Sequence, residues 1–254
     1  MEVNKIYNEN CLDTMAKMPD CFVDLTVTSP PYDNLRTYNG YSFDFEAVAK
    51  ELYRVTKQGG VVVWIVGDAT IKGSETGTSF RQALYFKEIG FNLHDTMIWV
   101  KDGGGAIGSN KCYTQNFEYM FVFSKGKIST TNLIYDKPNA SFGKDSCGAR
   151  KGRRLVTGEH KIEKRKPSAE FSRRNNYWYI PPQKGEHEHP AVFPEALAND
   201  HILSWSNEGD LVYDPFMGSG TTAKMAIANK RNWIGSEISK EYCEIAEKRI
   251  NENL

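Results

Sequence analysis

The sequence has few cysteines and no long hydrophobic run. Its five cysteines are an odd number and include no Cys-x-x-Cys pair, so we expect neither a disulfide framework nor a zinc site. Apolar runs such as Val61 to Val66 are far shorter than the roughly 20 residues of a membrane-spanning helix, and residues 1–20 lack the apolar core of a secretory signal. These absences predict a soluble, cytoplasmic protein with reduced thiols and no membrane partner.

The sequence also lacks net charge, but its charges are unevenly distributed. It has 32 basic and 32 acidic residues in a total of 254. The segment from Lys125 to Lys184 holds fifteen basic residues against five acidic ones, so the rest of the chain carries the balancing negative charge. A basic segment on an acidic body is typical of a nucleic-acid contact surface, although a charge run can also be only a solvated face.

Short β-rich runs and helical patterns alternate on both sides of this basic segment. Strands are expected at 5–7, 23–27, 61–66, 96–100, 119–123, 211–213 and 232–238. Helices are expected at 10–18, 45–55, 80–89, 192–205, 221–229 and 242–250, with Gly59-Gly60 stopping the second. The alternation predicts an α/β fold with helices on both faces of a mostly parallel sheet, and 96–100 and 119–123 could pair antiparallel at its edge.

We therefore expect one α/β domain that is interrupted by an insertion. Residues 1–124 and 186–254 would form the two halves of the domain, and residues 125–185 the basic insertion, in which periodicity fades.

A glycine turn between the strand at 211–213 and the helix at 221–229 has the pattern of a ligand-binding loop. It reads Asp214-Pro215-Phe216-Met217-Gly218-Ser219-Gly220-Thr221. Glycines there allow the backbone to approach a ligand at the carboxyl end of the strand, although such turns can also be purely structural. No lysine follows the glycines as in a phosphate-binding P-loop, which disfavours a nucleoside triphosphate. Glu237 ends the next predicted strand, where a carboxylate can accept hydrogen bonds from ribose hydroxyls.

A rigid loop, Ser29-Pro30-Pro31-Tyr32, follows the strand at 23–27. Its two prolines restrict the backbone. The Ser29 hydroxyl and the Pro30 carbonyl are both hydrogen-bond acceptors, and Tyr32 offers a flat ring. Such a loop suits an exocyclic amine on a planar base, although the same residues could form a plain turn with a surface tyrosine.

Together, Thr28 to Tyr32 and Asp214 to Thr221 resemble the motifs of the DNA amino-methyltransferases, which make N4-methylcytosine or N6-methyladenine. The order of catalytic loop, basic segment and cofactor loop is similar to the circularly permuted β group of that family. The resemblance covers about residues 5–250 and is weakest in the insertion. It implies a Rossmann-like fold that binds S-adenosylmethionine and acts on double-stranded DNA, with the insertion as target-recognition region and a cognate restriction endonuclease as a candidate partner.

The resemblance also implies roles for individual residues. The cofactor-binding residues would be Asn10, Phe193, Pro194, Glu195, Asp214, Pro215, Phe216, Gly218, Gly220, Thr221 and Glu237. The catalytic loop would be Ser29, Pro30, Pro31 and Tyr32, with the flipped target base stacked on the tyrosine. The DNA-binding residues would be Arg150, Lys151, Arg153, Arg154, Lys164, Arg165, Lys166, Arg173 and Arg174.

Two positions depart from the usual family pattern. Glu9-Asn10 stands where Gly-Asp is frequent, so that Asn10 would be the acceptor for the adenine of the cofactor. Serine at position 29 is commoner in cytosine-N4 enzymes and aspartate in adenine-N6 enzymes, which favours cytosine slightly and leaves adenine as the alternative.

Other functions are less consistent with the sequence. RNA or protein-glutamine methyltransferases usually place the cofactor loop before the catalytic loop, which is the opposite order. A DNA-binding module without activity would not need the acidic and glycine positions. Methylation of a ring carbon is disfavoured because no cysteine follows a proline, and a metal site because His187 and His189 lack a Glu-x-x-His pattern.

Overall fold

The computed structural model describes residues 1–31, 44–101, 112–143, 149–154, 160–164, 168–182 and 194–251, and only the backbone of 149–154 and 160–164. The chain divides into two compact units. Met1–Asn132 and Asn176–Leu254 form the larger unit, and Leu133–Asn175 form the smaller one. The smaller unit lies within the basic segment and is shorter than the predicted insertion, because residues 125–132 and 176–185 belong to the larger unit.

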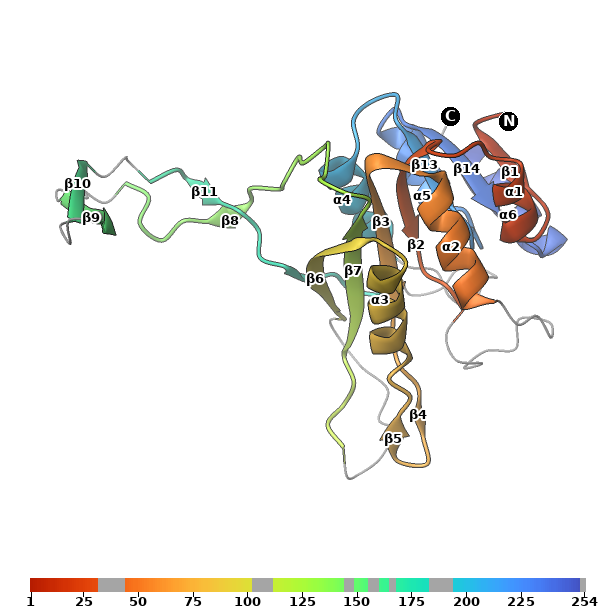
Figure 1. Cartoon of the computed structure of the whole chain (residues 1–254), viewed down its shortest axis with the longest axis horizontal. Coiled ribbons are helices and arrows are strands. Elements are labelled where there is room, and N and C mark those ends of the chain that lie inside the picture. The colour runs from red at the N-terminus through yellow and green to blue at the C-terminus, as the bar shows by residue number, and fades with distance from the viewer. Residues whose placement is uncertain are drawn as a thin grey trace. The chain divides into compact units, whose positions relative to one another are not determined.

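The larger unit is built on an eight-stranded sheet in the order β1-β14-β13-β2-β3-β7-β6-β12 (Figure 1). The strands are β1 (Lys5–Tyr7), β2 (Val23–Thr28), β3 (Thr56–Val66), β6 (Asn92–Val100), β7 (Phe117–Ser124), β12 (Tyr177–Tyr179), β13 (Leu211–Asp214) and β14 (Asn232–Ser236). Only β7 runs antiparallel to its neighbours β3 and β6. The predicted mostly parallel sheet of an α/β fold is confirmed.

Helices cover both faces of this sheet, as predicted. They are α1 (Cys11–Ala16), α2 (Phe45–Val55), α3 (Thr78–Glu88), α4 (Glu195–Trp205), α5 (Thr221–Ala228) and α6 (Lys240–Asn251). Figure 1 shows α2 and α3 in front of the sheet and α4 behind it. No helix of the described residues is long and apolar enough to cross a membrane.

Aromatic side chains form much of the core between the sheet and α2 and α3. Trp64 of β3 is fully buried, and its indole nitrogen donates a hydrogen bond of 2.8 Å to Gln82 of α3. Phe86 of α3 stacks on Phe123 of β7 with ring centroids 4.5 Å apart. These contacts fix α3 over β3 and β7, and α3 also lies against β6.

Two elements differ from the sequence-based expectation. The helix α2 ends at Val55, and Gly59 and Gly60 lie within the longer strand β3 instead of stopping the helix. A hydrogen bond from the Thr56 hydroxyl to the Leu52 carbonyl caps the carboxyl end of α2, before the two glycines are reached. The predicted antiparallel pair of β6 and β7 is present, but β12 pairs parallel to β6 and extends the sheet beyond it.

The smaller unit consists of short antiparallel strand pairs. Strand β8 (Lys137–Pro138) pairs with β11 (Phe171–Ser172), and β9 (Ala149–Arg154) pairs with β10 (His160–Lys164). In the larger unit a separate hairpin of β4 (Thr70–Ile71) and β5 (Ser74–Glu75) precedes α3. Its base is anchored by Asp68, which accepts a hydrogen bond of 2.9 Å from the Ser79 amide at the start of α3.

Candidate active site

The two predicted loops emerge from neighbouring strands. Strand β13 pairs in parallel with β2, so that Val212 lies beside Leu25 and Tyr213 beside Thr26. Because both strands end at the carboxyl edge of the sheet, the loop after Thr28 and the turn after Asp214 start side by side although they are far apart in sequence. This edge is where ligands bind in open α/β sheets.

A buried hydrogen bond joins the starting points of the two loops. The Thr28 hydroxyl donates to Oδ1 of Asp214 at 2.6 Å, and the Phe216 amide donates to the same oxygen at 3.1 Å. Asp214 is 1% exposed and Thr28 is fully buried. The contact therefore fixes the end of β2 to the first residue of the glycine turn. Sequence reasoning assigned no role to Thr28, because a threonine at a strand end carries no signal of its distant partner.

The environment of Asp214 makes its negative charge unfavourable in the free protein. Burial raises the pKa of Asp214 to about 6, and the hydrogen bond from Thr28 opposes this only in part. The second carboxylate oxygen, Oδ2, is buried and has no hydrogen-bond partner among the described residues. A buried carboxylate with a free oxygen is expected to bind a cation or donor when one enters the site.

The glycine turn adopts backbone conformations that side chains disfavour. Gly218 has a φ of 51° and Gly220 a φ of 81°, both in the left-handed region. Gly220 directly precedes α5, and a Cβ placed there would lie 3.0 Å from the Cβ of Ala246 on α6. The turn therefore needs glycine both for its backbone and for the close approach of α6.

Glu237 closes the other side of the turn. Its Oε2 accepts a hydrogen bond of 2.9 Å from the Gly218 amide, and its Oε1 accepts one of 2.8 Å from the Ser239 amide. Burial raises the pKa of Glu237, and these amides oppose the rise. Each carboxylate oxygen accepts one amide and can accept a further donor, which is the arrangement needed to bind a pair of ribose hydroxyls.

An arginine that the sequence analysis missed supports the turn from behind. Arg249 of α6 is buried and donates two hydrogen bonds of 2.6 Å, to the carbonyl and to the hydroxyl of Ser219. It also contacts Oε1 of Glu195 at 3.1 Å, and the same oxygen accepts from Lys224 at 2.7 Å. In the described structure Glu195, predicted to bind the cofactor, holds this ion-pair network. An arginine within an amphipathic closing helix gives no sequence signal of this role.

The remaining predicted site residues have different surroundings. Asn10 is exposed, and its side chain caps α1 by accepting a hydrogen bond of 2.9 Å from the Leu12 amide. Pro30 and Pro215 are buried, while Ser29, Pro31 and Phe216 are half-buried, with the Phe216 ring centroid 6.3 Å from that of Trp64. Pro194 precedes α4, and Thr221 begins α5. Tyr32 and Phe193 lie outside the described residues.

The nine predicted DNA-binding residues all fall within the range of the smaller unit. Arg150, Lys151, Arg153 and Arg154 lie on β9 and Lys164 on β10, where only the backbone is described, and Arg165 and Lys166 lie outside the described residues. Arg173 is exposed, whereas the Arg174 guanidinium is paired with Asp136, with its Nε 2.9 Å from the carboxylate. Four of these arginines and lysines thus share one strand.

The turn fits S-adenosylmethionine in its chemistry. The cofactor carries a positive sulfonium and amino group, which suit the unpaired buried oxygen of Asp214, and a ribose diol, which suits Glu237. The left-handed glycines provide the close approach of backbone that such a ligand needs. Within the described ranges, no three His, Cys, Asp or Glu side chains are placed to hold a metal ion.

The chain is similar to known DNA methyltransferases in both sequence and fold. A family model described as DNA methylase matches residues 23–248. The chain is 62% identical over 242 residues to the orphan methyltransferase M.BamHII of Bacillus amyloliquefaciens, covering 91% of this chain and 89% of the relative. Its fold is similar to that of the cytosine-N4-specific PvuII DNA methyltransferase, with a TM-score of 0.71 and 21% identity, covering 98% and 86% of the two chains. It is also similar to M1.HpyAVI in complex with SAM, with a TM-score of 0.63 and 24% identity, covering 96% and 98%.

Proposed function

Because this chain belongs to the DNA methylase family and is an S-adenosylmethionine-dependent DNA amino-methyltransferase, we propose that the turn after β13 holds the cofactor and the loop after β2 receives the target amine. The observation that carries this assignment of sites is the buried hydrogen bond from Thr28 to Asp214. It fixes the two loops to each other at one edge of the sheet. Transfer between two bound groups requires such a fixed distance, because misplacement by about 1 Å can slow a reaction on the order of 100-fold.

Three features of the turn would hold the cofactor. Gly218 and Gly220 allow its methionine part to approach the backbone, Glu237 accepts hydrogen bonds from its ribose, and Asp214 favours its positive charge. When bound, S-adenosylmethionine supplies an electrophilic methyl group. The raised pKa of Asp214 supports this role, since a cation nearby would favour the ionised form that the free protein disfavours.

The catalytic loop would hold the amine and accept its proton. The Ser29 hydroxyl oxygen and the Pro30 carbonyl accept hydrogen bonds from the amino group, which orients the lone pair of its nitrogen. The nitrogen becomes acidic once it carries a methyl group, so a weak acceptor such as Ser29 suffices to pass the proton to water. Tyr32 would stack on the flipped base, an assignment that rests on the sequence motif.

We further propose cytosine N4 as the target, with adenine N6 as the alternative, because position 29 is serine. Unmethylated DNA would be incubated with the protein and S-adenosylmethionine, digested to nucleosides and analysed by mass spectrometry. N4-methyldeoxycytidine is the expected product. N6-methyldeoxyadenosine alone would overturn the choice of base but support amine methylation, whereas 5-methyldeoxycytidine or no methylated nucleoside would contradict the proposed chemistry.

The basic strand β9 is proposed to contact DNA phosphates. Replacing Arg150 and Arg153 together by alanine should weaken DNA binding and make it less dependent on salt. If each arginine neutralises one phosphate, the slope of log affinity against log salt falls by about 0.9 per residue. Binding would be measured by fluorescence anisotropy at several salt concentrations.

The matched control replaces Lys50 and Lys240, exposed lysines of α2 and α6, by alanine. These changes remove the same charge and should leave the slope as in the wild type. An unchanged slope for the β9 variant would exclude these two arginines from the phosphate contacts.

The cellular setting is also a proposal. The relative at 62% identity is named an orphan methyltransferase, which supports an enzyme that acts without a cognate restriction endonuclease. As a DNA-modifying enzyme related to bacterial methyltransferases, it would work in the cytoplasm, where the DNA is.

A further inference from the structure

The hairpin of β4 and β5 leaves the sheet beside the proposed catalytic loop. Strand β3 ends at Val66, and the hairpin, residues 70–75, follows almost directly. Because β3 pairs in parallel with β2, with Trp64 beside Thr28, the hairpin and the loop after β2 start from the same edge of the sheet. We call residues 70–75 the β4–β5 finger.

Hydrogen bonds hold the base of the finger in place. Asp68 is buried and accepts hydrogen bonds from the Ser79 amide at 2.9 Å, from the Ser79 hydroxyl and from the Thr76 hydroxyl at 3.3 Å. The Thr76 amide donates to the Ala69 carbonyl at 2.9 Å and closes the hairpin at its base. The finger is thus fixed to the end of β3 and to the start of α3, and its direction is set by the fold.

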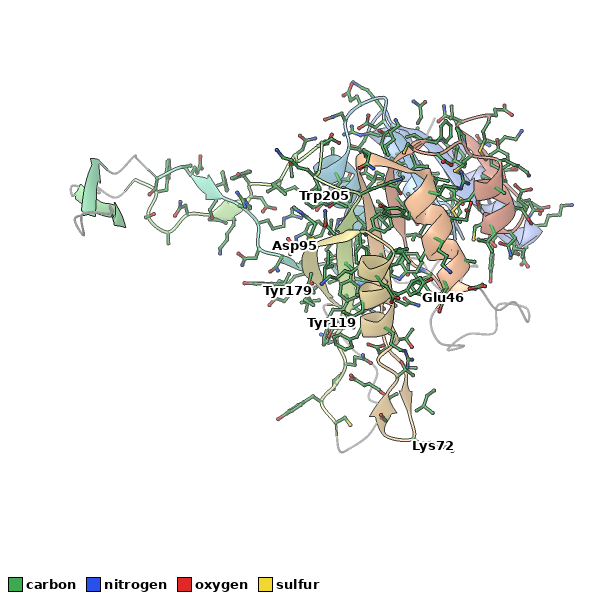
Figure 2. All side chains as sticks on the ribbon, in the orientation of Figure 1. Glu46, Lys72, Asp95, Tyr119, Tyr179 and Trp205 are labelled. Carbon is green, nitrogen blue, oxygen red and sulfur yellow. The ribbon has the colours of Figure 1, made fainter. Side chains whose placement is uncertain are left out.

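The tip of the finger is a tight turn that carries a cation. Lys72 and Gly73 have φ values of 51° and 81°, as in the two-residue turns that join hairpin strands. A lysine in this left-handed conformation costs backbone energy, whereas asparagine or glycine forms the same turn more readily. In the view of Figure 2, Lys72 lies at the outer end of the finger, far from the labelled Tyr119.

An apolar side chain is exposed directly beside this cation. Ile71 is 56% exposed, and its cross-strand partner is Ser74, which is too small to cover it. All six residues of the finger are exposed, and a Cβ placed on Gly73 would meet no described atom within 4 Å. The tip therefore offers one apolar and one positively charged side chain to a partner outside the chain.

The finger is long enough to reach the bases of a DNA duplex. The three residues from Ala69 to Lys72 span roughly 10 Å at the rise of a β-strand. The grooves of B-DNA are about 7.5–8.5 Å deep. A protein seated against the phosphates could therefore bring this tip to the base pairs.

We propose that the β4–β5 finger enters a groove of the DNA beside the target base, with Ile71 filling the space that the flipped base leaves and Lys72 paired with a phosphate. This inference rests on the proposed methylation of a flipped base. Extrusion of a base costs stacking energy, and an apolar side chain inserted at the gap replaces part of the lost contacts. A protein partner is a poorer fit, because one apolar side chain beside a cation is far smaller than a stable protein interface.

Single-turnover methylation tests the role of Ile71. The recognition sequence is first located by sequencing DNA that the protein has methylated, and a duplex that carries it is the substrate. Ile71→Ala should methylate this duplex roughly tenfold more slowly than the wild type, with unchanged affinity for S-adenosylmethionine. Ile71→Leu keeps the apolar bulk and should react nearly as the wild type does. Val3→Ala removes a 37% exposed apolar side chain before β1, at the opposite edge of the sheet, and is the matched control.

A mismatched target base separates the filling of the gap from a general defect. Such a base is extruded more easily, so Ile71→Ala should methylate the mismatched duplex within about twofold of the wild type. Lys72→Ala should lower the slope of log affinity against log salt by about 0.9, and Ile71→Ala should leave it unchanged.

Three results would overturn this inference. The first is a wild-type rate for Ile71→Ala on the matched duplex, and the second is an equally large loss on the mismatched duplex. In both cases an active wild type would leave the proposed function intact, whereas a wild type without methylation activity would remove the function and the inference together. The third is a changed sedimentation mass of Ile71→Ala with an unchanged methylation rate, which would assign the finger to a protein contact.

Discussion

Replacing Asp214 by alanine should lower the affinity for S-adenosylmethionine on the order of 100-fold, because hydrogen bonds to a charged group are each worth about 1.5–3 kcal/mol. The variant loses the acceptor that fixes Thr28 and the Phe216 amide, and it loses the negative charge beside the proposed cofactor site. Isothermal titration calorimetry of the protein without DNA measures the effect. Equal affinity in the wild type and Asp214→Ala would contradict the assignment of the cofactor turn.

Asparagine at position 214 separates the charge of this residue from its hydrogen bonds. Its amide oxygen can still accept from Thr28 and Phe216, but it cannot attract the positive cofactor. Affinity for the cofactor should therefore fall for Asp214→Asn while the turn stays folded. The wild type should also bind the cofactor more tightly as the pH rises through about 6, where Asp214 ionises, and Asp214→Asn should lack this dependence.

The same substitution should change how stability depends on pH. Burial raises the pKa of Asp214 from 3.8 to about 6, so the folded protein binds this proton more tightly than the unfolded chain does. The neutral carboxyl therefore contributes about 3 kcal/mol to the free energy of unfolding below about pH 4. This contribution is lost as the pH rises through 6. Between pH 4 and 7, Tm of the wild type should fall relative to that of Asp214→Asn. Parallel Tm curves would contradict a buried, ionising Asp214.

Tyr32→Ala is expected to show the opposite separation of binding and turnover. The variant should bind S-adenosylmethionine like the wild type but methylate DNA roughly 10 to 100 times more slowly, since stacking of a base on an aromatic ring is worth about 1–3 kcal/mol. Single-turnover methylation of a DNA duplex, with cofactor binding measured in parallel, gives both quantities. Tyr32→Phe retains the ring and is the matched control, with a rate close to that of the wild type.

Two results would count against this role of Tyr32. A loss of cofactor affinity as large as that of Asp214→Ala would place the tyrosine in the cofactor site. A loss of turnover in Tyr32→Phe equal to that in Tyr32→Ala would assign the effect to the hydroxyl group and not to stacking.

The sequence predicts most of the fold because its strands and helices are strongly patterned. Val61 to Val66 is a continuous apolar run, and β3 is buried on both faces as that run predicts. Strand β12 is the clearest exception. Three residues, Tyr177 to Tyr179, carry no periodic signal, and their partners at Ile98 to Val100 are distant in the sequence. Only the tertiary arrangement makes them a strand.

The sequence indicates the loops of the proposed site but not the contacts that support them. The glycine turn and Glu237 can be recognised from the sequence, because glycines after a strand and an acidic residue at a strand end form local patterns. The contacts of Thr28 and Arg249 cannot be recognised in this way, since the partner of each residue is far away in the sequence. Glu195 shows the reverse case, in which a residue matching the family pattern is engaged by Arg249 and Lys224 in the described structure.

The strand order has a consequence for synthesis of the protein. In the sheet the strand order is β1-β14-β13-β2. Strands β13 and β14, which are synthesised long after β1 and β2, therefore lie between them. The edges of β1 and β2 therefore stay unpaired until residues 211–236 have emerged, and unpaired edges promote aggregation. A chain that stops before Leu211 would expose two open edges and lack the whole cofactor turn. The enzyme can thus become active only after residues 211–236 have emerged, and not as soon as its proposed catalytic loop appears.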